Sequence, residues 1–121
     1  MAQFVKYEMS DALYDSVKVI VEKASKSGKI KVGVNEVTKI LERGKAKFVV
    51  MAEDVSPEEL LLHIPSLSES KKVPFTYVKA KKELGEFAGL KVGTSCLVLL
   101  DEGQAKKEIE ALVKQIKELK D

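Results

Sequence analysis

The chain has 121 residues and a formal net charge of +2, and it is 45% hydrophobic and 33% charged. This composition excludes a disordered chain, and the length suits one domain, which we expect to span residues 1–121. The single cysteine excludes an internal disulfide and a cysteine-based metal cluster. No apolar run reaches the ~18 residues that cross a bilayer, and the acidic, interrupted start of the chain does not resemble a targeting signal. We therefore expect a soluble, cytoplasmic protein that does not contact membranes.

Apolar periodicity and turn residues divide the chain into alternating helices and strands. The expected elements are, in chain order, a helix over 10–28, a short strand over 29–32, a helix over 35–44, a strand over 47–52, a helix from 57, a strand over 73–78, a helix over 81–89, a strand over 95–100 and a helix over 104–120. This alternation predicts an α/β protein, a three-layer α/β/α sandwich with a small mixed sheet of four to five strands.

The expected helix boundaries depend on a few residues. Ser10 and Asn35 are good N-caps, and Ser56 before Pro57 predicts the start of the third helix, which Pro65 should interrupt. The apolar stripes that should face the core contain Leu13, Val17, Ile20 and Ala24 in the first helix, Val37, Ile40 and Leu41 in the second, and Ala105, Ile109, Leu112, Ile116 and Leu119 in the last.

The sequence offers little catalytic chemistry. His63 is the only histidine, and we expect it to be a partly buried structural residue. Cys96 lies in an apolar run and should be a buried, inert thiol, and Asp54 should be an ordinary acid in a loop before a helix. No glycine-rich nucleotide-binding motif is present. We expect no catalytic residues, no metal site and no cofactor, so an enzyme is the less favoured alternative.

Charge is distributed in blocks along the chain. Residues 29–47 and 71–91 each carry a net charge of +4, whereas residues 48–70 between them carry −5. If the fold brings the two basic blocks together, they form a face that can bind phosphates. Charge alone favours the simpler alternative of ordinary solvated lysines.

The segment GVNEVTK, residues 33–39, groups several functional side chains at an expected helix start. Gly33 permits close approach of the backbone to a ligand. Asn35 offers a hydrogen-bond donor and an acceptor, Glu36 offers acceptors only, and Lys39 can share their face of the helix. A carboxylate is a poor phosphate ligand but accepts hydrogen bonds from nucleobases, so the set suits purine edges better than bare phosphate. The alternative is a helix cap beside a solvent-exposed Glu36–Lys39 pair.

Two long segments make the sequence resemble a known family. They read GVNEVTKILERGKAKFVVMAEDVSPEELLLHIPSL and VPFTYVKAKKELGEFAGLKV. Together they resemble the kink-turn RNA-binding ribosomal protein family. Its archaeal form is a large-subunit ribosomal protein that also looks to be the core protein of box C/D and H/ACA guide ribonucleoproteins and a subunit of ribonuclease P. The resemblance implies an α/β/α sandwich and a non-catalytic, RNA-binding role.

The resemblance also implies which residues contact the RNA. A regular A-form major groove is too narrow for side chains, so such a protein must read a distorted internal loop. The implied contacts are Gly33, Asn35, Glu36 and Lys39 at tandem sheared G·A pairs, Leu60 and Lys81 at a flipped-out nucleotide, and Leu90, Lys91 and Val92 at the internal loop. Candidates for contacts to the RNA backbone, which position the protein and do not specify sequence, are Lys29, Lys31, Arg43, Lys79 and Lys82.

A few positions depart from the family pattern. Val32 and Val34 stand where members often have a basic residue and a small or hydroxyl residue. Ser56 stands where an acid often lies near the flipped base, and the loop after Val92 reads GTSC where alanine is common. These changes touch details of recognition and leave the base-reading side chains in place.

The expected partners are structured RNAs with kink-turns, namely ribosomal RNA, guide RNAs and ribonuclease P RNA, together with ribonucleoprotein assembly proteins. We expect a monomer when the protein is free. One alternative is an RNA-docking accessory subunit of an RNA-modifying enzyme, which would need a partner chain. The other is a protein-interaction module that uses the acidic segment 53–59 and the terminal helix.

Overall fold

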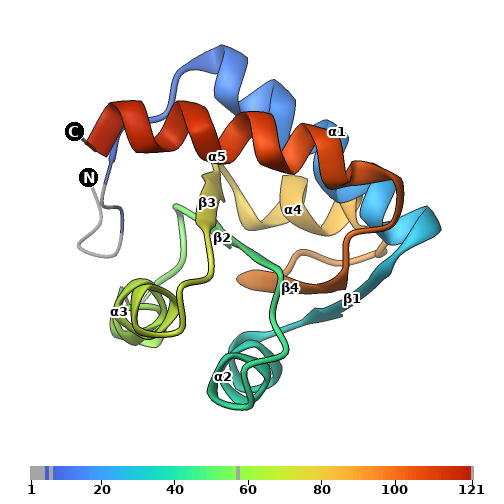
Figure 1. Cartoon of the computed structure of the whole chain (residues 1–121). Helices are drawn as coiled ribbons and strands as arrows, with labels where there is room; N and C mark the ends of the chain where they lie inside the picture. Colours follow the sequence, from blue (N-terminus) through green and yellow to red (C-terminus); the bar gives the residue numbers. More distant parts are fainter. Residues whose placement is uncertain (1–4, 6, 57, 121) are drawn as a thin grey trace.

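The computed structural model describes residues 5, 7–56 and 58–120, in which helices and strands alternate (Figure 1). The helices are α1 (Asp11–Ser27), α2 (Val34–Glu42), α3 (His63–Ser70), α4 (Lys81–Phe87) and α5 (Lys106–Lys120), the strands are β1 (Lys29–Val32), β2 (Phe48–Ala52), β3 (Phe75–Val78) and β4 (Cys96–Asp101), and two 3-10 turns are η1 (Glu58–Leu60) and η2 (Gly103–Ala105). None of the helices in this described part has the length and apolar character of a membrane span.

The four strands form one mixed sheet in the order β1-β4-β2-β3. β2 and β3 are parallel, with Val49 opposite Phe75, whereas β4 is antiparallel to both β1 and β2. β1, β2 and β3 therefore all end at the edge of the sheet where β4 begins. We call this the site edge, and we call the opposite edge, where β1, β2 and β3 begin, the far edge.

Helices cover both faces of the sheet. α2 and α3 lie side by side on one face, and α1, α4 and α5 lie on the other (Figure 1). α2 connects β1 to β2, and α3 connects β2 to β3, so both helices run from the site edge back to the far edge. The predicted three-layer α/β/α sandwich is confirmed, with four strands in its sheet.

The core lies between the sheet and its two helical layers. Every residue of β2 and β3 is buried, as expected for strands covered on both faces. The predicted apolar stripes of α1, α2 and α5 are buried as well, while the side chain of Leu119 lies outside the described part of the structure. The stripes predicted the core because an α-helix has 3.6 residues per turn, so apolar residues three or four positions apart lie on one face and are buried together.

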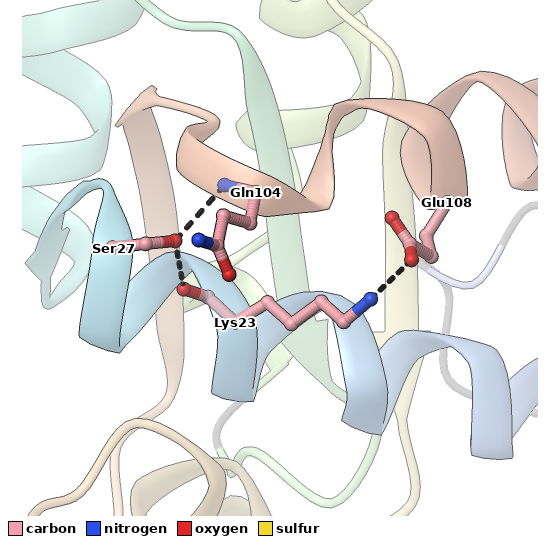
Figure 2. Close-up of polar contacts among 4 residues, drawn as sticks. All are labelled: Lys23, Ser27, Gln104 and Glu108. Atoms are coloured by element: carbon pink, nitrogen blue, oxygen red, sulfur yellow. Dashed lines mark hydrogen bonds and ion pairs between the residues drawn. The ribbon is translucent and has the colours of Figure 1, made fainter.

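Polar contacts join α1 to the segment that begins α5, as Figure 2 shows. The Ser27 hydroxyl accepts a hydrogen bond from the Gln104 backbone N–H at 2.9 Å and donates one to the Lys23 carbonyl at 2.7 Å. The Lys23 ammonium forms an ion pair with the Glu108 carboxylate. These contacts connect helices that are far apart in the sequence.

The prediction that Asn35 caps α2 is wrong. The N-cap is Gly33, and Asn35 is the second residue of the helix. Gly33 has φ 97° and ψ 150°, a backbone conformation that suits glycine, and its carbonyl accepts the Val37 N–H at 3.0 Å. Because β1 passes into α2 through this single residue, the helix begins earlier than the side-chain pattern indicated.

The prediction for the third helix is also wrong. Ser56 and the residues after it do not begin an α-helix; they lead into the 3-10 turn η1, and Pro57 lies outside the described residues. α3 begins at His63 and contains Pro65 in its first turn. The first four N–H groups of a helix have no intrahelical partner, so a proline there removes no hydrogen bond and does not interrupt the helix.

Candidate nucleic-acid interface

Four separate chain segments meet at the site edge. The Gly33 N–H, at the start of α2, donates to the Cys96 carbonyl at 2.9 Å. The Glu53 N–H, just after β2, donates to the Val78 carbonyl at 2.9 Å. The segments that the sheet topology places at this edge are 33–39, 53–56, 58–60, 79–83 and 90–95.

The tip of α2 presents polar side chains that are not used by the fold. Asn35 and Lys39 are exposed, and Glu36 is half-buried. Among the described residues, the ion pairs involve neither Glu36 nor Lys39, so the alternative of a Glu36–Lys39 pair is not what the structure has. The first backbone N–H groups of α2 also lie at this tip and favour electronegative groups. The tip therefore offers donors and acceptors to an external partner.

Asp54 ties the loop after β2 to the start of α4. Its carboxylate accepts the Lys81 backbone N–H at 2.8 Å, and it serves as a cap because Ala80, the N-cap residue, has no polar side chain. The Lys81 carbonyl in turn accepts the Thr94 N–H at 3.0 Å. Asp54 is indeed a loop acid, but its capping of α4 was missed, because the two residues are 27 positions apart and no local pattern connects them.

The loop over residues 90–95 packs directly on α4. A Cβ atom built on Gly85 would lie 2.1 Å from the Val92 carbonyl oxygen, so only glycine allows this approach. The Val92 side chain is 73% exposed, and Leu60 in η1 is 46% exposed. Leu90 is half-buried and Lys91 is exposed. Val92 and Leu60 therefore leave apolar surface exposed at the site edge.

Not every lysine at this edge is equally available to a ligand. Lys81 and Lys82 are exposed. The Lys79 ammonium lies 3.4 Å from the Asp11 carboxylate and 5.1 Å from the centre of the Tyr14 ring. The Tyr14 hydroxyl donates a hydrogen bond to Glu53, and burial together with this bond raises the pKa of Tyr14. Lys79 is therefore held toward α1 by internal contacts.

The fold does not gather the two basic blocks as wholes at the site edge. Each basic block contains elements that run from one edge of the sheet to the other, so each block is divided between the two edges. Lys29 begins β1 opposite Asp101, and Arg43 is the C-cap of α2, so both lie toward the far edge. Lys31 is exposed within β1. Of the candidates for backbone contacts, Lys79 and Lys82 belong to the site edge.

His63 is exposed, so its prediction as a partly buried residue is wrong. Its position as the first residue of α3 explains the difference, because a helix start at the edge of the sheet is open to solvent. The ring Nε2 lies 2.8 Å from the Thr38 hydroxyl oxygen and so connects α3 to α2. Thr38 directly precedes Lys39 in α2, so this hydrogen bond helps to position the tip of α2.

Cys96 is buried at the start of β4, as predicted. Burial raises the pKa of the Cys96 thiol to about 11, which keeps it protonated and unreactive near neutral pH. Among the described residues, no group of three His, Cys, Asp or Glu side chains is arranged to hold a metal ion. The chemistry that this edge offers is hydrogen bonding and apolar contact.

Two comparisons with known proteins are informative. The family model described as the ribosomal protein L7Ae/L30e/S12e/Gadd45 family matches residues 15–109, which is more than half of the chain. The structure is similar to that of the 15.5kD RNA binding protein of Giardia lamblia, with 26% sequence identity and a TM-score of 0.85 over 98% of each chain. The protein therefore belongs to the L7Ae/L30e/S12e/Gadd45 family of ribosomal proteins.

Proposed function

We propose that this protein binds RNA at the site edge and recognises kink-turns through their tandem sheared G·A pairs. The observation that carries the proposal is the tip of α2, where Asn35 is exposed and where Glu36 and Lys39 have no ion-pair partner among the described residues. The space beside Gly33 is open, because beyond its own chain neighbours no heavy atom would lie within 4 Å of a Cβ atom added there. Membership of a ribosomal protein family and similarity to an RNA-binding protein support the same proposal.

The neighbouring groups have complementary roles in this proposal. Lys81 and Leu60 hold a flipped-out nucleotide, and Leu90, Lys91 and Val92 pack on the internal loop. Val92 suits this role because its exposed apolar side chain provides a surface on which unstacked bases can lie. Arg43, at the other end of α2, contacts the RNA backbone.

The proposed mechanism is a population shift and involves no catalysis. A protein that binds the kinked RNA better than the extended RNA stabilises the kink by its differential affinity. A ~100-fold preference supplies about 2.7 kcal/mol toward the kinked state. The kinked RNA then nucleates ribonucleoprotein assembly. We propose that the protein acts as a single domain and a cytoplasmic monomer, on ribosomal RNA, guide RNAs or ribonuclease P RNA.

Binding to two matched RNA hairpins in the same salt tests the proposal. One hairpin carries a kink-turn with tandem G·A pairs, and the other replaces those pairs with Watson–Crick pairs. We expect a preference of roughly 2–4 kcal/mol for the first hairpin, since several base contacts of about 1–3 kcal/mol each are lost on the second. Equal, salt-sensitive binding to both hairpins would show a general affinity for phosphate and would contradict the proposal.

A further inference from the structure

The site edge, where we propose that RNA bases are read, carries less positive charge than the far edge. The site-edge segments 33–39, 53–56, 58–60, 79–83 and 90–95 together carry a net charge of −1. The far-edge segments 28–29, 42–47, 69–74 and 101–103 together carry +2. The edge proposed to read bases thus lacks excess positive charge, and the excess lies at the other end of α2 and α3.

Four of the six basic residues in the far-edge segments are lysines that lie in two connections between helix and strand. Lys45 and Lys47 lie between α2 and β2, and Lys71 and Lys72 lie between α3 and β3. All four are exposed, and the ion pairs of the described residues involve none of them.

The fold brings these two pairs of lysines together. β2 and β3 are parallel neighbours, and the Val49 N–H donates to the Pro74 carbonyl at 3.1 Å. Extending this register by two residues places Lys47 level with Val73, the residue after Lys72. α2 and α3 lie side by side on the same face (Figure 1). Each helix ends just before one of the two lysine pairs, so the connections that contain the pairs are neighbours at the far edge.

We propose that Lys45, Lys47, Lys71 and Lys72 form a second RNA-contact surface, which binds backbone phosphates of a stem that adjoins the RNA element held at the site edge. This proposal rests on the proposed function. A five-residue strand spans roughly 17 Å, so a stem that leaves the site edge reaches the far edge within about one helical turn. We call these four lysines the far-edge lysines.

RNA fits the far-edge lysines better than an acidic protein segment does. Lysine is a point charge on a flexible side chain, so these four lysines can follow backbone phosphates without a fixed, planar geometry. A stem of an RNA that is already bound also has an effective concentration near the millimolar range, so individually weak phosphate contacts become useful.

Four RNAs and two protein variants test the proposal. The RNAs are the kink-turn hairpin and its Watson–Crick counterpart, each with short stems and with stems extended by one helical turn. One variant replaces the far-edge lysines with glutamine. The matched control replaces Lys26, Lys106, Lys107 and Lys114, four exposed lysines of α1 and α5 on the other face of the sheet, and loses the same charge.

On the extended RNA, binding by the far-edge variant should depend less on salt than binding by the control. We expect the magnitude of the slope of log K against log salt to be smaller by about two to three units, because each lost phosphate contact removes ~0.7–0.9 unit. The affinity of the far-edge variant at low salt should fall about tenfold more than that of the control. Both variants should behave alike on the short RNA. Thermal unfolding should be unchanged, because all substituted side chains are exposed.

Equal slopes for the two variants on the extended RNA would overturn the second surface, whether or not the protein prefers a kink-turn. Loss of the kink-turn preference in the unsubstituted protein would overturn the proposed function instead. In that case a slope difference on the extended Watson–Crick hairpin would still support the far-edge lysines as a phosphate-binding surface. An effect of the far-edge variant only on association with an acidic polypeptide, such as polyglutamate, would overturn the assignment of RNA as the partner.

Discussion

At the residue scale, the proposed site depends on side chains that the fold leaves unused. A buried polar group must find a partner within the protein, whereas Asn35 and Lys39 are exposed and Glu36 is only half-buried, so water can satisfy them. Substitutions at the tip of α2 should therefore change ligand binding and leave stability almost unchanged. Substitution of buried Cys96 should instead change stability.

Glu36→Gln should weaken binding to the kink-turn hairpin by about 1–3 kcal/mol, because the amide replaces one of two accepting oxygens with a donor at a base edge. The matched control is Glu42→Gln, an exposed glutamate near the other end of the same helix. Titrations with both hairpins measure the effect. Similar losses for Glu36→Gln and Glu42→Gln would indicate a general charge effect and no base reading.

Cys96 should make stability depend on pH in the alkaline range. Burial raises the pKa of its thiol to about 11, above the ordinary value of about 8.5 in an unfolded chain. The folded state therefore holds the proton more tightly. This contribution to stability is complete below about pH 8.5 and is lost as the pH rises through about 11.

Urea unfolding of the wild type and of Cys96→Ala between about pH 8 and 11 measures this effect. The free energy of unfolding should fall more steeply with pH for the wild type than for Cys96→Ala. The smaller alanine side chain also changes stability, but by an amount that does not depend on pH. Parallel pH profiles for the two proteins would contradict the prediction.

At the element scale, short elements are held by contacts between segments that are distant in sequence. α4 has seven residues and no cap from its own N-cap residue, and it depends on Asp54 for the missing hydrogen bond. Because the same helix supports the loop with Val92, the cap also positions an apolar part of the proposed site. The Asp54 carboxylate thus influences the loop over residues 90–95 through α4, although no described hydrogen bond joins Asp54 to that loop.

Asp54→Ala should destabilise the protein by about 0.5–2 kcal/mol, the usual cost of losing a helix cap. Hydrogen exchange of the Lys81 backbone amide should accelerate, and the NMR signals of residues 90–95 should shift, since Thr94 is bonded to the Lys81 carbonyl. Asp15→Ala, at another exposed acid, provides the control. An unchanged exchange rate at Lys81 would exclude the capping role and leave the proposed RNA function untouched.

At the scale of the whole molecule, contacts between α1 and α5 connect the beginning and the end of the described chain. The Lys23–Glu108 ion pair is the clearest of them (Figure 2). The hydrogen bond from Lys23 lowers the pKa of Glu108 below its ordinary value. The charged pair therefore favours the folded state only while Glu108 is ionised.

This pair should make stability depend on pH in the acid range. Its contribution is present above the ordinary glutamate pKa of about 4.3 and is lost as the pH falls through the lowered value. Between about pH 6 and pH 3, the melting temperature of the wild type should therefore fall more than that of Lys23→Gln. Lys114→Gln, at an exposed position of α5, should follow the wild type. Calorimetry at several pH values checks the prediction, and identical curves for all three proteins would contradict it.

The sequence alone predicted the architecture and most element positions. Apolar runs and helical stripes predict which faces are buried, because burial of apolar side chains is the dominant favourable term in folding. The spacing of these side chains along the chain is a local feature that the sequence shows directly. The glycine and the polar residues of GVNEVTK were found as a site candidate for a related reason. Their chemistry is local, so their grouping is visible along the chain.

Features that depend on contacts between distant segments could not be read from the chain. The exposure of His63, the capping of α4 by Asp54 and the division of the basic blocks between two edges all follow from how β-strands pair and which way each helix returns. A count of charges along the chain does not say at which edge each charge lies, because the strands and helices such as α2 and α3 carry their two ends to opposite edges of the sheet. The sequence therefore determined the layers and the chemistry of the α2 tip, and only the tertiary structure decided which groups surround it and where the excess positive charge lies.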